Sequence, residues 1–218
     1  MNQIIHEKQD MTYLSWSKIR NSSGTAGSFL KVYSDLGGTK TYYKLSNYDS
    51  VRGVTGHECI NELIVDRLLT RLGVEHLSYQ LIHADVLLDG RVQEVWLCAS
   101  EDFKQTGESK IALDAYYQAE RLSPSETALQ FCIRNGWEEY IYTMLVVDFL
   151  ILNRDRHGAN IEVLRNRRRK SFRLAPLFDH GLSFVFRCET PEQLANEDVM
   201  ADKPVQCFVG SRSSWENL

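Results

Sequence analysis

The strongest constraint on the fold is an apolar run from Tyr140 to Leu152 that contains one acidic residue, Asp148, and leads directly into a charged loop. The run is too short to span a bilayer, which takes about 20 apolar residues. It therefore predicts a buried helix of a soluble protein, ending near Asn153. Because a buried carboxylate needs a partner, we expect Asp148 to orient the loop that follows.

The first hundred residues have a different pattern, with the spacings of two β-hairpins around one helix. This strand-rich half and the helix-rich half after it predict an α+β fold of two lobes with a cleft between them. Residues 1–100 form the predicted small antiparallel sheet lobe, and residues 101–218 form the predicted helical lobe. The elements predicted in the first lobe are the strands Phe29–Tyr33 and Thr41–Leu45, the helix Gly56–Leu72, and the strands Tyr79–Leu88 and Val92–Ala99.

Glycine and serine residues mark the predicted ends of several elements. Gly73 stands where the C-cap of the helix is expected. The polar stretch from Glu101 to Ser123 predicts an irregular connection, and the helical pattern resumes with Ser123 or Ser125 as the N-cap. Four consecutive cations, Arg167 to Lys170, predict a solvated hairpin tip, with contact to an acidic substrate or a membrane as the alternative.

Composition excludes several classes of protein. The chain has 25 basic and 29 acidic residues and a net charge of −4, which argues against nucleic-acid binding as its main role. Its five cysteines form no Cys-x-x-Cys pair, so neither a zinc ribbon nor a disulfide framework is indicated. The cysteines are therefore expected to be reduced thiols, and the first thirty residues show no signal-peptide pattern. Both features predict a cytoplasmic protein without membrane contact.

Two short loops carry the residue types of a metal site. Asp155 and Asn160 lie five residues apart in the loop after the apolar helix, and Asp179 follows in Leu177-Phe178-Asp179-His180-Gly181. Carboxylate and amide oxygens suit Mg²⁺ held against phosphates. A hairpin between the loops would bring Asn160 and Asp179 together. The alternative is that both acids only cap helices or turns.

The run Asp155-Arg156-His157-x-x-Asn160, with Phe178-Asp179-His180-Gly181 after it, resembles the catalytic and metal-binding loops of phosphatidylinositol-kinase-like kinases. Extended back to Asn153 and joined to Leu174-Ala175-Pro176, the pattern is more similar to that of the bacterial HipA-like serine/threonine kinases. The resemblance covers roughly residues 22 to 179. It implies a two-lobed protein-kinase-like fold that binds ATP and Mg²⁺ and transfers the γ-phosphate to a Ser or Thr hydroxyl of a protein.

The resemblance also implies roles for single residues of the second lobe. Asp155 would be the catalytic acid facing the substrate hydroxyl. Asn160 and Asp179 would be the Mg²⁺ ligands. His157 matches the HipA-like loop, and we expect it to be structural. These groups supply the positioning and charge neutralisation on which phosphoryl transfer depends.

The first lobe should supply a lysine for the nucleotide phosphates and an acid to hold it. Lys44 lies in a predicted strand at the position that the resemblance requires. Glu62 matches the HipA-like helix pattern better than Glu58, which stands one turn earlier on the same face. A solvated edge lysine is the alternative for Lys44.

Two further segments complete the nucleotide site that the resemblance implies. The Gly/Ser-rich stretch from residue 22 to 28 occupies the position of a phosphate-covering loop, where small residues let backbone amides approach an anion. The end of the last predicted strand would be the hinge whose backbone takes the adenine edge. The residues assigned to these roles are Ser23, Gly24 and Thr25 in the loop, and Leu97, Cys98 and Ala99 in the hinge.

The chain departs from the family after the second metal loop, where HipA-like kinases usually continue as a substantial helical region. Only 39 residues follow Asp179, so either the chain is a fragment or its helical lobe is minimal. The alternatives to a protein kinase are a phosphatidylinositol-type lipid kinase, and a pseudokinase or toxin-like regulatory partner that binds nucleotide without turnover. The expected partners are a protein substrate and an antitoxin-like protein.

Overall fold

A computed structural model describes residues 3–16, 29–35 and 38–218. The chain divides into two compact units. Unit 1 comprises Met1–Asp102 and Phe186–Asn196, and unit 2 comprises Phe103–Val185 and Glu197–Leu218. Unit 1 is therefore discontinuous, since it takes in a segment that lies after the second predicted metal loop.

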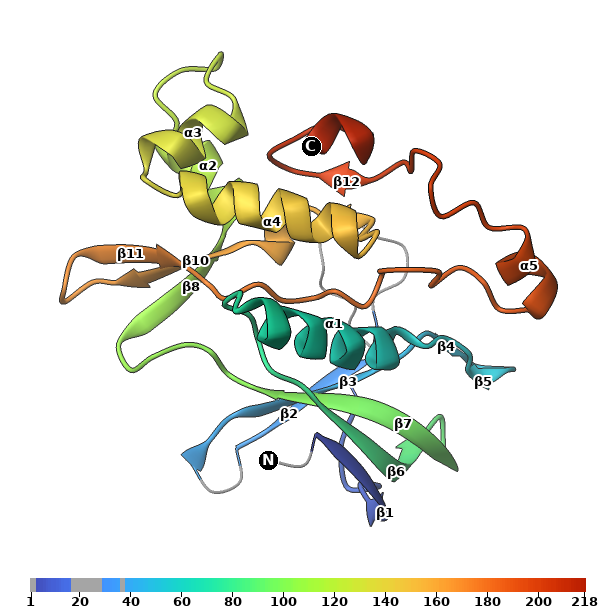
Figure 1. Cartoon of the computed structure of the whole chain (residues 1–218). Helices are drawn as coiled ribbons and strands as arrows, with labels where there is room; N and C mark the ends of the chain where they lie inside the picture. The colour runs from blue at the N-terminus through green and yellow to red at the C-terminus, as the bar shows by residue number, and fades with distance from the viewer. Residues whose placement is uncertain (1–2, 17–28, 36–37) are drawn as a thin grey trace. The chain divides into compact units, whose positions relative to one another are not determined.

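Unit 1 is built on a five-stranded sheet with the strand order β1-β6-β7-β3-β2 (Figure 1). The predicted hairpins are present as β2–β3 and β6–β7, but β1, which pairs in parallel with β6, was not predicted. The elements are β1 (Ile4–Asp10), β2 (Lys31–Ser34), β3 (Thr41–Leu45), β4 (Tyr48–Asp49), β5 (Gly53–Val54), α1 (Glu58–Leu72), β6 (Gln80–Leu88), β7 (Arg91–Glu101) and α5 (Pro191–Ala195).

Both faces of the central strands β6 and β7 are buried. Side chains alternate across a strand, so Leu81 and Cys98 pack with Leu63 of α1 on one face. Ile82 and Leu97 point to the opposite face, in a second apolar cluster. Where both faces are covered, from Val95 to Ala99 of β7, the sequence is a continuous apolar run, which made this part of the strand easy to recognise.

The connection from α1 to β6 is held by a buried ion pair. Gly73 ends α1 in the left-handed conformation (φ 68°), as predicted. Three residues later His76 places Nδ1 2.7 Å from the Val74 carbonyl oxygen and Nε2 2.9 Å from Asp66 Oδ1. A carbonyl and an ionised carboxylate can only accept hydrogen bonds, so both ring nitrogens donate and the imidazole is protonated. The hydrogen bond to Asp66 accordingly raises the pKa of His76.

This pair predicts a pH-dependent stability for unit 1. A histidine whose pKa is higher in the folded than in the unfolded state stabilises fully below the unfolded value, about 6.5. The stabilisation is lost as the pH rises through the folded pKa. We expect the free energy of unfolding of unit 1 to fall over that range, and to lose this dependence in His76→Gln. Urea unfolding at several pH values measures it, with His83→Gln in the same unit as control. A pH dependence that persists in His76→Gln would contradict the assignment.

Unit 2 combines three α-helices with two small sheets (Figure 1). The three-stranded sheet has the order β11-β10-β8, and the two-stranded sheet pairs β9 with β12 in parallel. The elements are β8 (Glu108–Ala112), α2 (Leu113–Glu120), α3 (Ala128–Arg134), α4 (Glu138–Leu150), β9 (Asp155–Arg156), η2 (Gly158–Asn160), β10 (Glu162–Asn166), β11 (Ser171–Leu174), β12 (Gln206–Cys207) and η3 (Trp215–Asn217).

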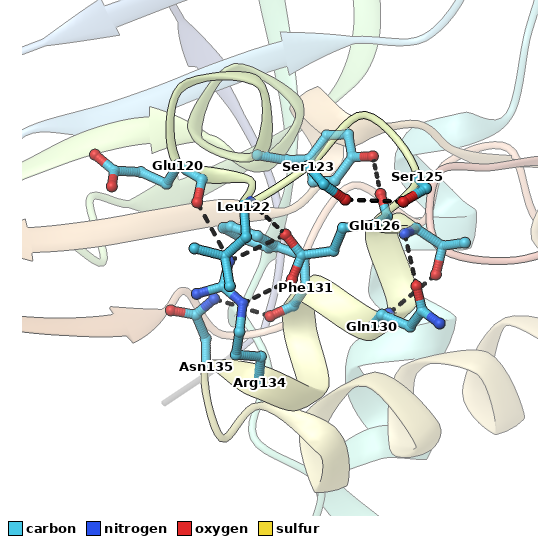
Figure 2. Close-up of polar contacts among 11 residues, drawn as sticks. Glu120, Leu122, Ser123, Ser125, Glu126, Gln130, Phe131, Arg134 and Asn135 are labelled. Carbon is cyan, nitrogen blue, oxygen red and sulfur yellow. Dashed lines mark hydrogen bonds and ion pairs between the residues drawn. The ribbon is translucent and has the colours of Figure 1, made fainter.

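The stretch predicted as an irregular connection contains β8 and α2. The predicted N-caps Ser123 and Ser125 are wrong, because Thr127 caps α3 through a reciprocal capping box with Gln130. Glu126 organises the turn before that helix: it accepts hydrogen bonds from the Leu122 amide and the Arg134 guanidinium, as Figure 2 shows. Ser123 and Ser125 therefore lie within the turn that Glu126 holds, and α3 begins only after Thr127.

Candidate functional site

The loop after α4 is anchored on the one acidic residue of that helix's apolar run. Asp148 accepts two hydrogen bonds of 2.8 Å from Arg156, at Nε and Nη2, and a third of 2.8 Å from the Asn153 side chain. Arg156 is only 2% exposed. Burial alone would lower the pKa of Arg156, but the Asp148 carboxylate outweighs it and Asp179 adds to the effect, so the pKa is raised. The expected orienting contact of Asp148 is therefore present.

Arg156 also joins the two loops that the sequence singled out. Its remaining terminal nitrogen, Nη1, donates to the backbone oxygen of Asn160 at 3.1 Å and to that of Phe178 at 2.8 Å. Phe178 immediately precedes Asp179. One buried guanidinium thus fixes the backbone beside both predicted metal ligands, although nineteen residues separate them in the sequence.

The Asn160 side chain is held in one orientation, and Asp179 has an unusual backbone conformation. Asn160 Nδ2 donates to the Asp155 backbone oxygen at 2.8 Å, which fixes the amide so that Oδ1 points away from that carbonyl. Asp179 adopts a left-handed backbone conformation (φ 60°), which is costly for a residue with a side chain. Through Arg156, the loop that holds Asp155 and Asn160 is joined within unit 2 to the backbone at Phe178, next to Asp179.

His157 and Gly158 shape the loop. His157 Nδ1 accepts a hydrogen bond from the Ala159 amide at 3.2 Å, the structural contact that we expected of this residue. A Cβ atom on Gly158 would lie 2.4 Å from Cβ of Asp114 at the start of α2, so only glycine fits there. The packing of α2 against the loop was not foreseen, and the glycine was its only signal in the sequence.

The sequence also gave no sign of the segment that supports the loop from its other side. β12 pairs in parallel with β9, so that Gln206 lies opposite Asp155. The Arg154 guanidinium donates to Glu197 at 3.2 Å, and Glu197 in turn binds Lys203 at 2.7 Å. Backbone pairing and this ion-pair chain hold residues on both sides of Asp155.

In unit 1 the predicted lysine–glutamate pair is formed. Lys44 Nζ lies 2.9 Å from Glu62 Oε1, and the two residues are 8% and 0% exposed. Glu58 instead accepts a hydrogen bond from the Asn47 amide at the start of α1. The pair is a buried, charged link between β3 and α1. Its role toward a nucleotide stays a prediction.

The predicted hinge is wrong in its position. Leu97, Cys98 and Ala99 lie in the middle of β7, paired with β3 on one side and with β6 on the other. Backbone groups of a central strand are used by the two ladders, so they cannot also take an adenine edge. β7 continues to Glu101, and the chain passes into unit 2 between Asp102 and Phe103.

Three predicted residues of the phosphate-covering loop, Ser23, Gly24 and Thr25, lie outside the described residues. Among residues 3–16, 29–35 and 38–218, no cluster of three or more His, Cys, Asp or Glu side chains is placed to hold a metal. A site for Mg²⁺ would instead rest on one amide oxygen and one carboxylate, those of Asn160 and Asp179, with phosphate and water as further ligands, and it stays a prediction. No helix in the described part of the chain is long and apolar enough to cross a bilayer.

Comparisons with known proteins identify the fold. No family model matches the sequence, and no curated protein matches it either. Among solved structures, the chain is similar to the proinflammatory kinase CtkA of Helicobacter pylori, with a TM-score of 0.57 and 19% identity, covering 83% of this chain. The chain spans 63% of the length of that kinase. At this identity the likeness shows the fold alone: the predicted α+β, protein-kinase-like fold is confirmed, and the narrower HipA-like resemblance stays a prediction.

Proposed function

We propose that this chain is a kinase that uses ATP and Mg²⁺ and transfers the γ-phosphate to a Ser or Thr hydroxyl of a protein. The observation that carries the proposal is the double hydrogen bond of Arg156 Nη1 to the backbone at Asn160 and at Phe178. It joins a loop with an acid and an amide to a loop with a second acid, in a kinase-like fold. Ser/Thr specificity follows the resemblance of these loops to those of HipA-like kinases.

Each side chain has a definite task in this proposal. Asp155 would orient the acceptor hydroxyl and take its proton at a carboxylate oxygen. Asn160 Oδ1 and the Asp179 carboxylate would hold Mg²⁺, which when bound neutralises charge on the nucleotide phosphates. Lys44, oriented by its hydrogen bond to Glu62, would contact the α- and β-phosphates.

The metal assignment makes a specific prediction for Asp179→Asn. An amide keeps the shape of the carboxylate but lacks its charge, so we expect ATP to bind this variant equally with Mg²⁺ and with EDTA. In the unchanged chain Mg²⁺ should strengthen binding about tenfold or more, since a full ionic ligand is present. Calorimetric titration measures the difference, with Asp198→Asn, an exposed acid of unit 2, as control. If Mg²⁺ still strengthens binding to Asp179→Asn, this residue is not a ligand.

The whole proposal is tested by incubating the chain with Mg²⁺, γ-labelled ATP and a mixture of proteins. Label on serine or threonine of the chain or of another protein is expected. ATP-dependent thermal stabilisation without any transfer would instead show a nucleotide-binding protein that does no chemistry. Label found only in added phosphatidylinositol would show a lipid kinase.

A further inference from the structure

The hairpin between the two loops of the candidate site is strongly basic. Residues 163–178 hold six basic side chains and no acidic one. Without these six, 19 basic residues stand against 29 acidic ones, so the rest of the chain carries a net charge of −10. The hairpin is therefore a local positive region on a chain that is otherwise strongly acidic.

The cations on the hairpin strands are used by the fold. Arg173 of β11 forms two hydrogen bonds of 2.9 Å with the Glu108 carboxylate of β8. Arg165 of β10 lies over the ring of its cross-strand neighbour Phe172, with 5.6 Å between the guanidinium carbon and the ring centroid. Both side chains thus stabilise the small sheet of unit 2.

The cations at the turn have no such use. Arg167, Arg168, Arg169 and Lys170 are exposed, and none of them forms an ion pair with any residue of the described ranges. Like charges at consecutive positions repel one another. The Glu108 carboxylate of β8 attracts Arg169, but it is paired with Arg173 and offsets little of this repulsion. The four charges are therefore available to a partner.

The turn has a defined conformation. Buried Asn166 accepts a hydrogen bond from the Arg169 amide at 3.0 Å, which closes the turn. Lys170 adopts a left-handed conformation (φ 49°), where glycine or asparagine would cost less. A lysine at this strained position adds a charge that the turn itself does not need, and such an outlier points to a function.

From these observations we infer that the turn from Arg167 to Lys170 is a docking site for an acidic segment of a protein. Arginine side chains bind carboxylates in a two-pronged geometry, and three of the four residues are arginine. A nucleic acid or an anionic membrane presents a broad negative surface, which the charge of −10 on the rest of the chain would repel. A short acidic peptide segment can reach the turn alone.

Together with the proposed function, on which this step rests, the docking site predicts how far a substrate's acidic segment lies from its phosphorylated hydroxyl. The strand β10 begins two residues after Asn160, and β11 ends five residues before Asp179. With a rise of about 3.3 Å per residue, the turn lies about 20 Å from the candidate metal ligands. A substrate bound at both places would carry its acidic segment at least about six extended residues away from the phosphorylated hydroxyl.

Binding can be measured without any catalysis. A fluorescent peptide of ten glutamates is titrated with the chain, and its anisotropy is followed at low and moderate salt. We expect saturable binding that weakens with salt and weakens about tenfold or more in R167E/R168E/R169E. The control R71E/R91E/R212E makes the same change of net charge at exposed arginines elsewhere and should bind like the unchanged chain. Equal weakening in both variants would overturn the inference.

Two further arms separate this inference from the proposed function. Phosphatidylserine vesicles or a DNA oligonucleotide that bind the turn while the glutamate peptide does not would overturn it in favour of those partners. In a transfer assay, a serine peptide with an acidic block seven residues away should be used better than its glutamine counterpart. If both peptides are phosphorylated equally and the triple substitution at the turn changes neither rate, the kinase activity is supported and the docking site is contradicted. Peptide binding at the turn without any phosphate transfer would support the docking site and contradict the proposed kinase activity.

Discussion

Asp155→Asn is expected to abolish phosphate transfer while nucleotide binding is kept. The side chain would act only on the attacking hydroxyl, so its loss should lower the transfer rate about 1,000-fold and leave the Kd for ATP unchanged. The asparagine keeps the size of the side chain, and the backbone oxygen of residue 155 can still accept the hydrogen bond from Asn160. Single-turnover transfer of labelled phosphate and calorimetric ATP titration measure the two quantities.

The control for this experiment is Glu120→Gln, which removes an exposed acidic charge of unit 2 away from the loop. It should leave both quantities unchanged. If Asp155→Asn instead weakens ATP binding as much as transfer, the carboxylate has a structural role in the loop and no separate part in the chemistry.

Arg156→Met should cause the largest loss of stability of any single change in unit 2. It leaves the buried Asp148 carboxylate with the hydrogen bond from the Asn153 amide but without its charged partner, and it releases the backbone at Asn160 and Phe178. Breaking a buried ion pair from one side costs about 3–5 kcal/mol. Hydrogen exchange of the α4 amides reports this loss for unit 2 alone.

The matched control is the double variant D148L/R156M, which removes both charges and keeps apolar volume. Because no unpaired charge remains buried, it should recover most of the lost protection. Arg156→Lys, which keeps one charge, serves if the methionine variant fails to fold. A double variant as unstable as Arg156→Met would show that the contacts to the two backbone oxygens, and not the ion pair, carry the stability.

The parts of the fold that were predictable have local signals. The hairpins β2–β3 and β6–β7 show strand patterns around turn residues, and α1 shows helical spacing that ends at Gly73. Asp148 was predictable as a residue that orients the following loop, because a carboxylate in an apolar helix implies a partner. The sequence did not decide between Arg154 and Arg156, and the structure shows that Arg156 is the partner.

The parts that were not predictable depend on distant partners. β1 has a mostly polar sequence and is a strand because it pairs in parallel with β6. β12 is only two residues long and exists because β9 lies beside it. The end of β7 was placed too early because Ser100 and Glu101 are polar, yet both pair with β3. Tertiary pairing decided all three, and no window of local sequence contains that information.

The discontinuity of unit 1 has a consequence for how the protein is made. The segment Phe186–Asn196, which belongs to unit 1 and provides Glu189 as an ion-pair partner for Arg52, follows Asp102 by more than 80 residues. At a synthesis rate of about 5–20 residues per second, it leaves the ribosome several seconds after the sheet. Unit 2 is also incomplete at that time, because β12 follows later still. Unit 1 therefore cannot finish folding until Asn196 has emerged, and unit 2 cannot finish until β12 has emerged, so a nascent chain should become protease-resistant in unit 1 only after residue 196 and in unit 2 only after residue 207.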